Sequence, residues 1–280
     1  MRASIAKNGS GMSLEYPVDE KFLERMDSEL TGWTDPVARL RDALVKNEFE
    51  LYCQPILALS GEMRSAKDFP VGEVLVRMQA EERALLPPGE FLPVFEHYGM
   101  MPQLDRWVVF HVAQRLGRGA GLKRLTVNVS GQTLQDAEFL PYVATAMSKY
   151  RVAAGALLFE IDESDVLARL EAAVRFANAA KALGCGVLID GFGRRSVSFT
   201  PLKVLRVDFV KVDGSIVRKL LASEAARTKL GAIVRVAEVL GTGVVAECVE
   251  DQQVLARLRE LKVSHAQGFG IHKPQPLASL

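Results

Sequence analysis

Eight short apolar or β-branched runs, most of them separated by segments of helical periodicity, constrain the fold of this chain more than any other feature. The runs are Glu50–Leu59, Gly72–Met78, Arg124–Val129, Ala156–Ile161, Cys185–Ile189, Leu205–Val212, Val244–Cys248 and Val263–Phe269. Strands that alternate with helices in this way are joined by right-handed crossovers into a parallel sheet. Eight of them in about 230 residues match the size of a closed (β/α)8 barrel.

We therefore expect an α/β fold with a single TIM-like barrel. An open doubly wound sheet is the alternative, but no glycine-rich dinucleotide fingerprint follows any of the runs. Asp35 and Pro36 resemble a helix N-cap followed by proline in the first turn, which opens a helix through about Asn47. Further helices are expected over 101–117, 132–150, 164–183, 215–240 and 250–261. The barrel domain is placed at 35–280, and 1–34 are interpreted as a flexible tail with a short helix.

The composition argues against several classes of partner. The net charge is +1, from 35 basic and 34 acidic residues, so no global field favours a nucleic acid polymer or a membrane surface. No uninterrupted apolar run approaches the roughly 18 residues of a membrane span, and no signal-peptide core follows the N-terminus.

The three cysteines, Cys53, Cys185 and Cys248, are odd in number and lie in apolar segments. Buried, reduced thiols in a cytoplasmic protein are expected.

Polar side chains occur where several of the apolar runs end. They are Asn128, Glu160, Asp190, Lys211, Asp213, Glu247, Glu250 and Gln267. Glu73 differs, because it begins its run rather than ending it. The C-terminal ends of barrel strands meet at one rim, and chemistry takes place there. A lone carboxylate at a strand end is more often a helix cap or a surface ion pair, but the whole set of carboxylates at one mouth would repel one another without a cation.

The chemistry of this set indicates a hard metal ion. Carboxylate and amide oxygens suit Mg²⁺ or Mn²⁺ rather than zinc. A lysine on the same rim suits a phosphate oxygen or the orientation of a water molecule. The residues themselves therefore favour divalent-metal phosphate chemistry.

The chain resembles the EAL domain, the cyclic-di-GMP phosphodiesterase and receptor module of bacterial signalling. The resemblance extends from about Asp35 to Pro276, and the joint order and spacing of its motifs make it specific. The motifs are Tyr52-Cys53-Gln54-Pro55-Ile56, Glu73-Val74-Leu75-Val76-Arg77 (the signature, with Val in place of Ala), Leu104-Asp105-Arg106-Trp107-Val108, Asn128-Val129-Ser130, Phe159-Glu160-Ile161-Asp162-Glu163, Lys211-Val212-Asp213, Ala246-Glu247-Cys248-Val249-Glu250 and Gln267-Gly268-Phe269.

The resemblance implies a role for each matching residue. Active members use two divalent ions to attack one phosphodiester with water, which gives linear pGpG. The first ion would be held by Glu73, Asn128, Glu160 and Asp190. Asp213 and Glu247 would lie on the side of the second metal and the water, with Lys211 near that water, so that Lys211 and Glu247 are the catalytic candidates. Glu163 would brace the loop after the fifth run, and the dinucleotide would contact Gln54, Glu73, Leu75, Arg77 and Gln267.

The pattern breaks in the loop after the fifth run. The active pattern of the family reads Asp-Asp-Phe-Gly-Thr-Gly-Tyr-Ser-Ser, and this chain has Gly191 in place of the second aspartate and Arg194 and Arg195 in place of Thr and Gly. One lost carboxylate and two gained arginines raise the local charge by three units, which disfavours a second divalent ion and favours a diphosphate anion. Arg194 or Arg195 is therefore a candidate partner for the anion, and the alternative is a pair of solvated loop arginines.

Three functions remain open from the sequence. A domain that binds cyclic-di-GMP as a receptor with little or no hydrolysis is favoured, with at most one Mg²⁺ or Mn²⁺ site occupied. A working Mg²⁺-dependent cyclic-di-GMP phosphodiesterase is the alternative, because most of the metal-site residues remain. An adaptor that has lost the nucleotide is the third. A protein partner or a homodimer is expected in addition to cyclic-di-GMP.

Overall fold

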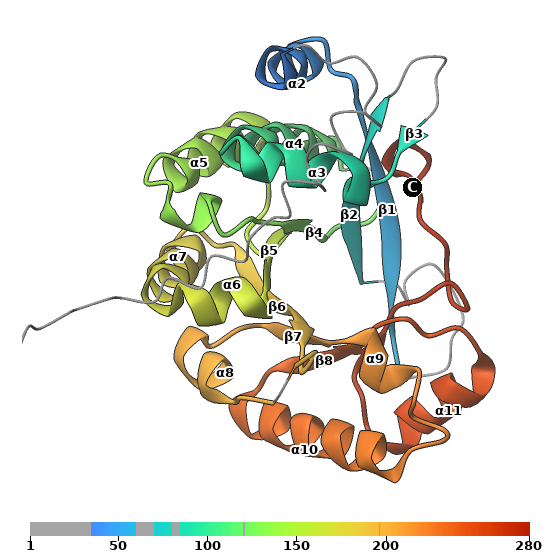
Figure 1. The fold of residues 1–280 in the computed structure, drawn as a ribbon. Helices are drawn as coiled ribbons and strands as arrows, with labels where there is room; N and C mark the ends of the chain where they lie inside the picture. The colour runs from blue at the N-terminus through green and yellow to red at the C-terminus, as the bar shows by residue number, and fades with distance from the viewer. Residues whose placement is uncertain (1–34, 60–69, 80–84, 120, 196) are drawn as a thin grey trace, which may run out of the picture.

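The computed structural model describes residues 35–59, 70–79, 85–119, 121–195 and 197–280 (Figure 1). The tail and short helix predicted within 1–34 lie outside the described residues. At the start of the described chain, the side chain of Asp35 accepts a hydrogen bond from the backbone N–H of Ala38 at 2.9 Å. It caps helix α2 (Pro36–Val45), so the predicted helix start at Asp35-Pro36 is confirmed.

Eight strands close into a ring, which confirms the (β/α)8 barrel. In order around the ring they are β1 (Phe49–Ala58), β2 (Val71–Gln79), β4 (Leu125–Asn128), β5 (Leu157–Asp162), β6 (Gly186–Phe192), β7 (Phe209–Val212), β8 (Gly243–Ala246) and β9 (His265–Ala266), and β9 pairs again with β1. The two-residue strands β3 (Leu85–Leu86) and β10 (Gln275–Pro276) extend β2 and β1 outside the ring.

The expectation of a wholly parallel sheet is wrong at the first strand. β2 and β4 to β9 run parallel to one another, but β1 is antiparallel to both β2 and β9. A parallel crossover needs a dozen or more residues and usually contains a helix, so the twelve residues 59–70 that connect β1 to β2 are at its lower limit, whereas an antiparallel pair can be joined by a short connection. As a result, the long strands β1 and β2 lie side by side in Figure 1 and pair over eight positions, from Phe49–Met78 to Ile56–Val71.

Helices cover the outside of the ring (Figure 1). They are α3 (Pro88–His97), α4 (Met101–Gly117), α5 (Phe139–Tyr150), α6 (Glu163–Ala168), α7 (Leu170–Ala182), α8 (Thr200–Leu205), α9 (Gly214–Val217), α10 (Glu224–Leu240) and α11 (Gln252–Glu260), with short 3-10 turns at Thr133–Gln135 and Leu277–Ser279. The helix predicted over 101–117 is confirmed. The run Leu205–Val212 is a strand only from Phe209, because α8 occupies 200–205 and ends at Arg206 in the left-handed conformation.

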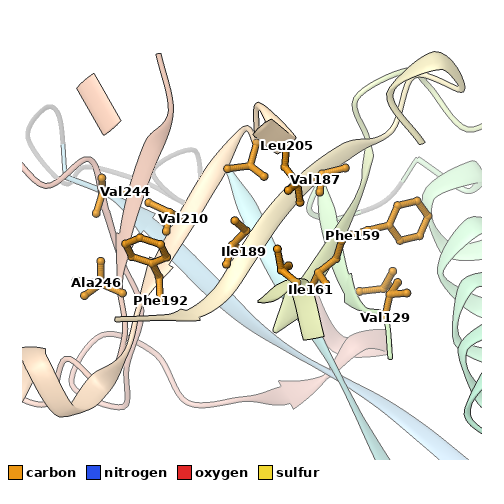
Figure 2. Close-up of a cluster of buried hydrophobic side chains, with 14 of the residues drawn as sticks. Val129, Phe159, Ile161, Val187, Ile189, Phe192, Leu205, Val210, Val244 and Ala246 are labelled. Atoms are coloured by element: carbon orange, nitrogen blue, oxygen red, sulfur yellow. The ribbon is translucent and has the colours of Figure 1, made fainter. Parts of the chain in front are cut away.

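The apolar core lies mainly between the strands and the helices. Figure 2 shows part of it, with Phe159, Ile161, Ile189 and Val210 from neighbouring strands β5, β6 and β7. The inside of the barrel is different. A small apolar group of Ile56, Val71 and Val245, with Phe209 against it, fills one level, and buried polar side chains such as Thr126, Glu160 and Lys211 occupy another. The strands therefore direct apolar groups outward, and inward they direct apolar groups at one level and polar groups at another.

Two expectations from composition can be compared with the structure. Cys53 and Cys185 are buried free thiols, but Cys248 is half-buried, because β8 ends at Ala246 before reaching it. The prediction of three buried thiols is therefore wrong for Cys248. Among the described helices, none has both the length and the apolar character needed to cross a bilayer.

The core between β5 and its helices makes a stability prediction. Phe159 is fully buried, with its ring centroid 6.0 Å from that of Phe139 and 5.4 Å from that of Phe176. Replacement Phe159→Ala should lower the free energy of unfolding by about 3–5 kcal/mol in urea titrations, because it leaves a cavity. Val45→Ala, at a side chain that is 80% exposed, is the control and should change it by less than about 0.5 kcal/mol. Equal effects would contradict the described core.

Candidate functional site

A single buried lysine lies at the centre of the polar residues inside the barrel. Nζ of Lys211, on β7, lies 2.8 Å from a carboxylate oxygen of Glu160 and 3.0 Å from one of Glu73. It also lies 3.2 Å from Asp190 and 3.3 Å from Glu247. Lys211 is only 1% exposed. Four carboxylates, from β2, β5, β6 and the segment after β8, are thus brought together around one ammonium group, and three of them, all but Glu73, were predicted from their places at the ends of apolar runs.

One positive charge facing four carboxylates leaves excess negative charge in a buried place. Burial, followed by repulsion from Glu73, raises the pKa of Glu160 to about 8, although Lys211 opposes this shift. Burial also raises the pKa of Glu247 to about 7, with repulsion from Asp190 and Glu73 against the attraction of Lys211. Burial by itself would lower the pKa of Lys211, but the surrounding carboxylates raise it well above its ordinary value. The cluster is therefore short of positive charge.

The side chains fit one divalent cation. Oδ1 of Asp190 is buried and has only the ion pair with Lys211, with no hydrogen-bond donor among the described residues. Asn128 donates to Glu73 at 3.3 Å, so an amide stands beside the carboxylates, and the donor set is hard oxygen throughout. The carboxylates turn toward Lys211 here, and within the described ranges no group of three His, Cys, Asp or Glu side chains already forms a metal cage.

A chain of amide side chains joins this cluster to a small cavity. Nε2 of Gln267 donates to Glu73 at 2.7 Å and to Gln54 at 3.3 Å, and Gln54 donates to the carbonyl of His272 at 2.9 Å. The cavity has a volume of about 170 Å³ and is lined by Gln54, Glu73, Arg218, Glu247, Cys248, Glu250, Gln267, Gly268 and Phe269. Oε1 of Gln267 is buried and, within the described part of the chain, accepts no hydrogen bond. It is an acceptor available to a ligand.

A second cavity lies on the other side of β2. Leu75, Asn128 and Asp162 line it together with apolar residues of α4, and its volume is about 460 Å³. Arg77, two residues further along β2, does not line either cavity as described; its guanidinium lies 5.8 Å from the ring centroid of Tyr52. The predicted nucleotide-contacting residues are therefore brought together, with the exception of Arg77.

The loop after β6 places an arginine where the sequence lacks a carboxylate. Nε of Arg194 lies 2.9 Å from Asp213 and Nη1 lies 3.1 Å from Asp162. A Cβ atom at Gly191 would lie only 2.5 Å from Nη2 of Arg194. Hydrogen bonding to Asp213 raises the pKa of Arg194 further, and although burial opposes it, hydrogen bonds from Ser215 and Arg194 lower the pKa of Asp213. Arg194 is thus paired with two carboxylates, although 52% of its side chain remains exposed, and Asp213 lies outside the Lys211 cluster.

Two ionisable residues, Glu163 and Lys229, hold the same loop through the backbone of Gly193. Oε2 of Glu163, at the start of α6, accepts a hydrogen bond from the backbone N–H of Gly193 at 3.0 Å. Nζ of Lys229, on α10, donates to the carbonyl of Gly193 at 2.6 Å. Gly193 adopts a positive φ of 82°, which suits glycine. These contacts fix the path of the chain directly before Arg194.

Asp105 is a supporting residue for which the sequence suggested no role. It lies on α4, is 5% exposed, and accepts hydrogen bonds from Thr133 Oγ1 at 2.6 Å and from Ser130 Oγ at 3.0 Å and N at 3.1 Å. These bonds hold the loop that follows Asn128. Thr126, which donates to Glu160, was also missed. The sequence signal for Asp105 was its place in the motif Leu104-Asp105-Arg106-Trp107-Val108, to which no role was given.

A further cavity, of about 680 Å³, lies away from this chemistry. Its lining includes Arg124, Asp208, Phe209 and Gly241, which precede or begin strands β4, β7 and β8, so it belongs to the opposite end of the barrel. The carboxylate cluster and the two cavities beside β2 therefore remain the candidate site.

Fold and site together define a TIM-like barrel with a carboxylate-rich polar site at one mouth. The family model described as the EAL domain matches residues 37–274, and the chain belongs to this family, whose phosphodiesterases are generally dependent on divalent metals. The chain is 32% identical over 259 residues to cyclic di-GMP phosphodiesterase PdeF of Escherichia coli, across 91% of this chain and 33% of that protein. It is 34% identical over 246 residues to cyclic di-GMP phosphodiesterase NbdA of Pseudomonas aeruginosa, across 86% and 31%. The chain thus spans about a third of these relatives.

Solved structures give the same family. The EAL domain of FimX from Pseudomonas aeruginosa bound to c-di-GMP has a TM-score of 0.79 and 29% identity, over 86% of this chain and 96% of that one. The phosphodiesterase PaMucR in complex with c-di-GMP has a TM-score of 0.78 and 26% identity, over 87% of this chain and 98% of that one.

The buried Asp105 predicts a pH-dependent stability. Burial raises its pKa to about 6, although bonds from Thr133 and Ser130 oppose this. The pKa of this carboxyl is 3.8 in the unfolded chain, so between pH 3.8 and about pH 6 the folded protein binds its proton more tightly than the unfolded chain does. The free energy of unfolding therefore falls as the pH rises through this window. The loss should approach roughly 3 kcal/mol. In Asp105→Asn this part of the slope should disappear in urea titrations at pH 4 to 7. Parallel pH profiles for parent and variant would contradict the assignment.

Proposed function

We propose that this domain binds cyclic-di-GMP across the two cavities beside β2 and acts as a receptor with little or no hydrolysis. The nucleotide would contact Gln54, Glu73, Leu75 and Gln267. Arg77 is retained as a contact residue only if its side chain turns away from Tyr52. Ligand-bound neighbours such as the FimX EAL domain support the choice of nucleotide.

The observation that carries this proposal is the state of the loop after β6. Position 191 supplies no side-chain oxygen, and Asp213 is engaged by Arg194 and by the backbone N–H of Ser215. A two-metal mechanism needs both ions to stabilise the attacking and leaving oxygens. A site with no carboxylate at position 191, and with Asp213 paired to Arg194, can still bind a nucleotide. It lacks ligands for the second ion that cleavage requires.

One divalent ion is part of the proposal. Mg²⁺ or Mn²⁺ would be held by Glu73, Asn128, Glu160 and Asp190, and when bound it would supply positive charge for a phosphate oxygen. The ammonium of Lys211 then holds Glu160 and Glu247 and presents a second positive charge beside the phosphate. Glu163 is proposed to support the loop through Gly193.

A Mg²⁺-dependent phosphodiesterase is the second candidate, and a specific observation favours it. Lys211 and Glu247, the two catalytic candidates, lie 3.3 Å apart, so the lysine and a carboxylate with a pKa raised toward neutrality face each other. A carboxylate in that range is suited to accept a proton from water. The relatives named as phosphodiesterases point the same way.

The partners of a receptor would include another protein or a second copy of this chain. An EAL barrel that retains its fold without binding the nucleotide would be an adaptor, the third function considered. A cytoplasmic location is proposed for the domain, because Cys53, Cys185 and Cys248 are free thiols, which suits a reducing compartment.

Calorimetric titration of cyclic-di-GMP into the protein with Mg²⁺ tests the proposal. We expect a saturable isotherm without sustained heat, and intact cyclic dinucleotide on subsequent chromatography. Sustained heat with pGpG as product would instead support the phosphodiesterase. No binding heat, together with no displacement of a fluorescent cyclic-di-GMP analogue, would leave the adaptor.

A matched pair of glutamine variants tests the location of the nucleotide. Gln267→Ala removes a buried amide from the first cavity and should weaken cyclic-di-GMP binding by roughly ten-fold or more. Gln253→Ala, on the exposed face of α11, is the control and should leave the affinity unchanged. Equal affinities for the two variants would place the nucleotide elsewhere.

A further inference from the structure

We propose that the guanidinium of Arg194 is a tethered cation that replaces a second divalent ion between the loops after β5, β6 and β7. The barrel mouth would then take one divalent ion rather than two, and Gly191 and Arg194 would be one coupled change rather than two independent ones. This inference deepens the proposed function and rests on it for the nucleotide, but the number of metal ions can be measured without nucleotide.

The contacts of Arg194 are those of a cation shared between loops. Asp162 ends β5 and Asp213 follows β7, and the guanidinium bonds to both, at 3.1 Å and 2.9 Å. Each carboxylate is also fixed by its own helix start, since Asp162 accepts from the N–H of Ser164 and Asp213 from the N–H of Ser215. The arginine therefore joins two pre-positioned carboxylates on either side of β6.

The space that the guanidinium occupies is the space that Gly191 leaves open. A Cβ atom at position 191 would lie 2.5 Å from Nη2 and 2.9 Å from Cζ of Arg194. The backbone N–H of Arg194 bonds to the carbonyl of Gly191 at 3.2 Å, so a tight turn holds the two residues together. Gly191 also has a positive φ of 65°, which is strained for most side chains. A side chain at 191 would therefore displace the guanidinium, which is the far end of a flexible side chain, from the position it holds here.

The positive charge of the Arg194 guanidinium also opposes a second divalent ion. A guanidinium remains protonated at any pH at which the protein is folded, so its positive charge cannot be displaced by deprotonation. A divalent ion bound to Asp213 would stand beside this charge and would lack a ligand from position 191. Coulomb repulsion at a few ångströms and the missing oxygen both oppose a second ion. In contrast, the carboxylates around Lys211 keep their excess negative charge for the first ion.

The test is a titration of the nucleotide-free protein with Mn²⁺, in which electron paramagnetic resonance of free Mn²⁺ gives the number of bound ions. The parent, Gly191→Asp and Arg194→Thr should each bind one Mn²⁺. The double variant Gly191→Asp with Arg194→Thr should bind two, because the carboxylate returns and the tethered cation leaves. A control of equal net charge, Gly191→Asp with Arg195→Thr, should still bind one, because Arg194, although shifted by the new side chain, still supplies its positive charge beside Asp213.

Several outcomes would overturn the inference. Two Mn²⁺ ions bound to the parent would do so without any variant, which keeps the test valid if position 191 does not accept Asp in the folded protein. Two ions bound to Gly191→Asp, or to its combination with Arg195→Thr, would show that the guanidinium does not exclude the second ion. Failure of the double variant to gain an ion, with its fold intact by circular dichroism, would also overturn it. A parent that binds cyclic-di-GMP and two Mn²⁺ would refute this inference and leave nucleotide binding standing.

Discussion

The attraction between one buried ammonium group and four carboxylates is the interaction on which the barrel mouth depends. Lys211 is 1% exposed, and its partners come from β2, β5, β6 and the segment after β8. An ion inside a protein is tolerated only when it is paired, because the cost of removing it from water is large. The lysine therefore holds together strands that are distant in the sequence, and the carboxylates left in excess create the demand for a further cation.

In the loop after β6, the side chain of Arg194 neutralises nearby carboxylates. In the function proposed above, an ion from solution supplies the missing positive charge around Lys211, whereas Arg194 pairs with Asp213. A covalently held guanidinium can pair with anions but cannot activate water as a metal ion does. On this proposal the mouth binds the nucleotide, and Arg194 occupies the part at which a second ion would act.

The repeated strands and helices made the barrel and most of its mouth predictable. Polar residues at strand ends pointed to Asn128, Glu160, Asp190 and Glu247, because the period of a strand and the geometry of a barrel fix where such ends meet. The direction of β1 was not predictable in this way, since an apolar run does not show whether its strand lies parallel or antiparallel to its neighbours. It is seen only in the antiparallel register of β1 with β2 and with β9.

The remaining features depend on side-chain positions that no local pattern encodes. That Arg194 folds back over Gly191 requires the turn between them and the carboxylates of Asp162 and Asp213, which lie 32 and 19 residues away in the sequence. The support of the β4 loop by Asp105 likewise crosses from one helix to another part of the chain. The position of the Arg77 side chain over Tyr52 is a further feature that the signature motif does not encode, and its predicted ligand contact stays a prediction.

The most direct test of this account is a crystal structure grown with cyclic-di-GMP and Mn²⁺, with anomalous scattering recorded at the manganese edge. The account predicts an intact cyclic dinucleotide, one anomalous peak among Glu73, Asn128, Glu160 and Asp190, and the guanidinium of Arg194 between Asp162 and Asp213. A second anomalous peak beside Asp213, or linear pGpG in the cavities, would contradict it.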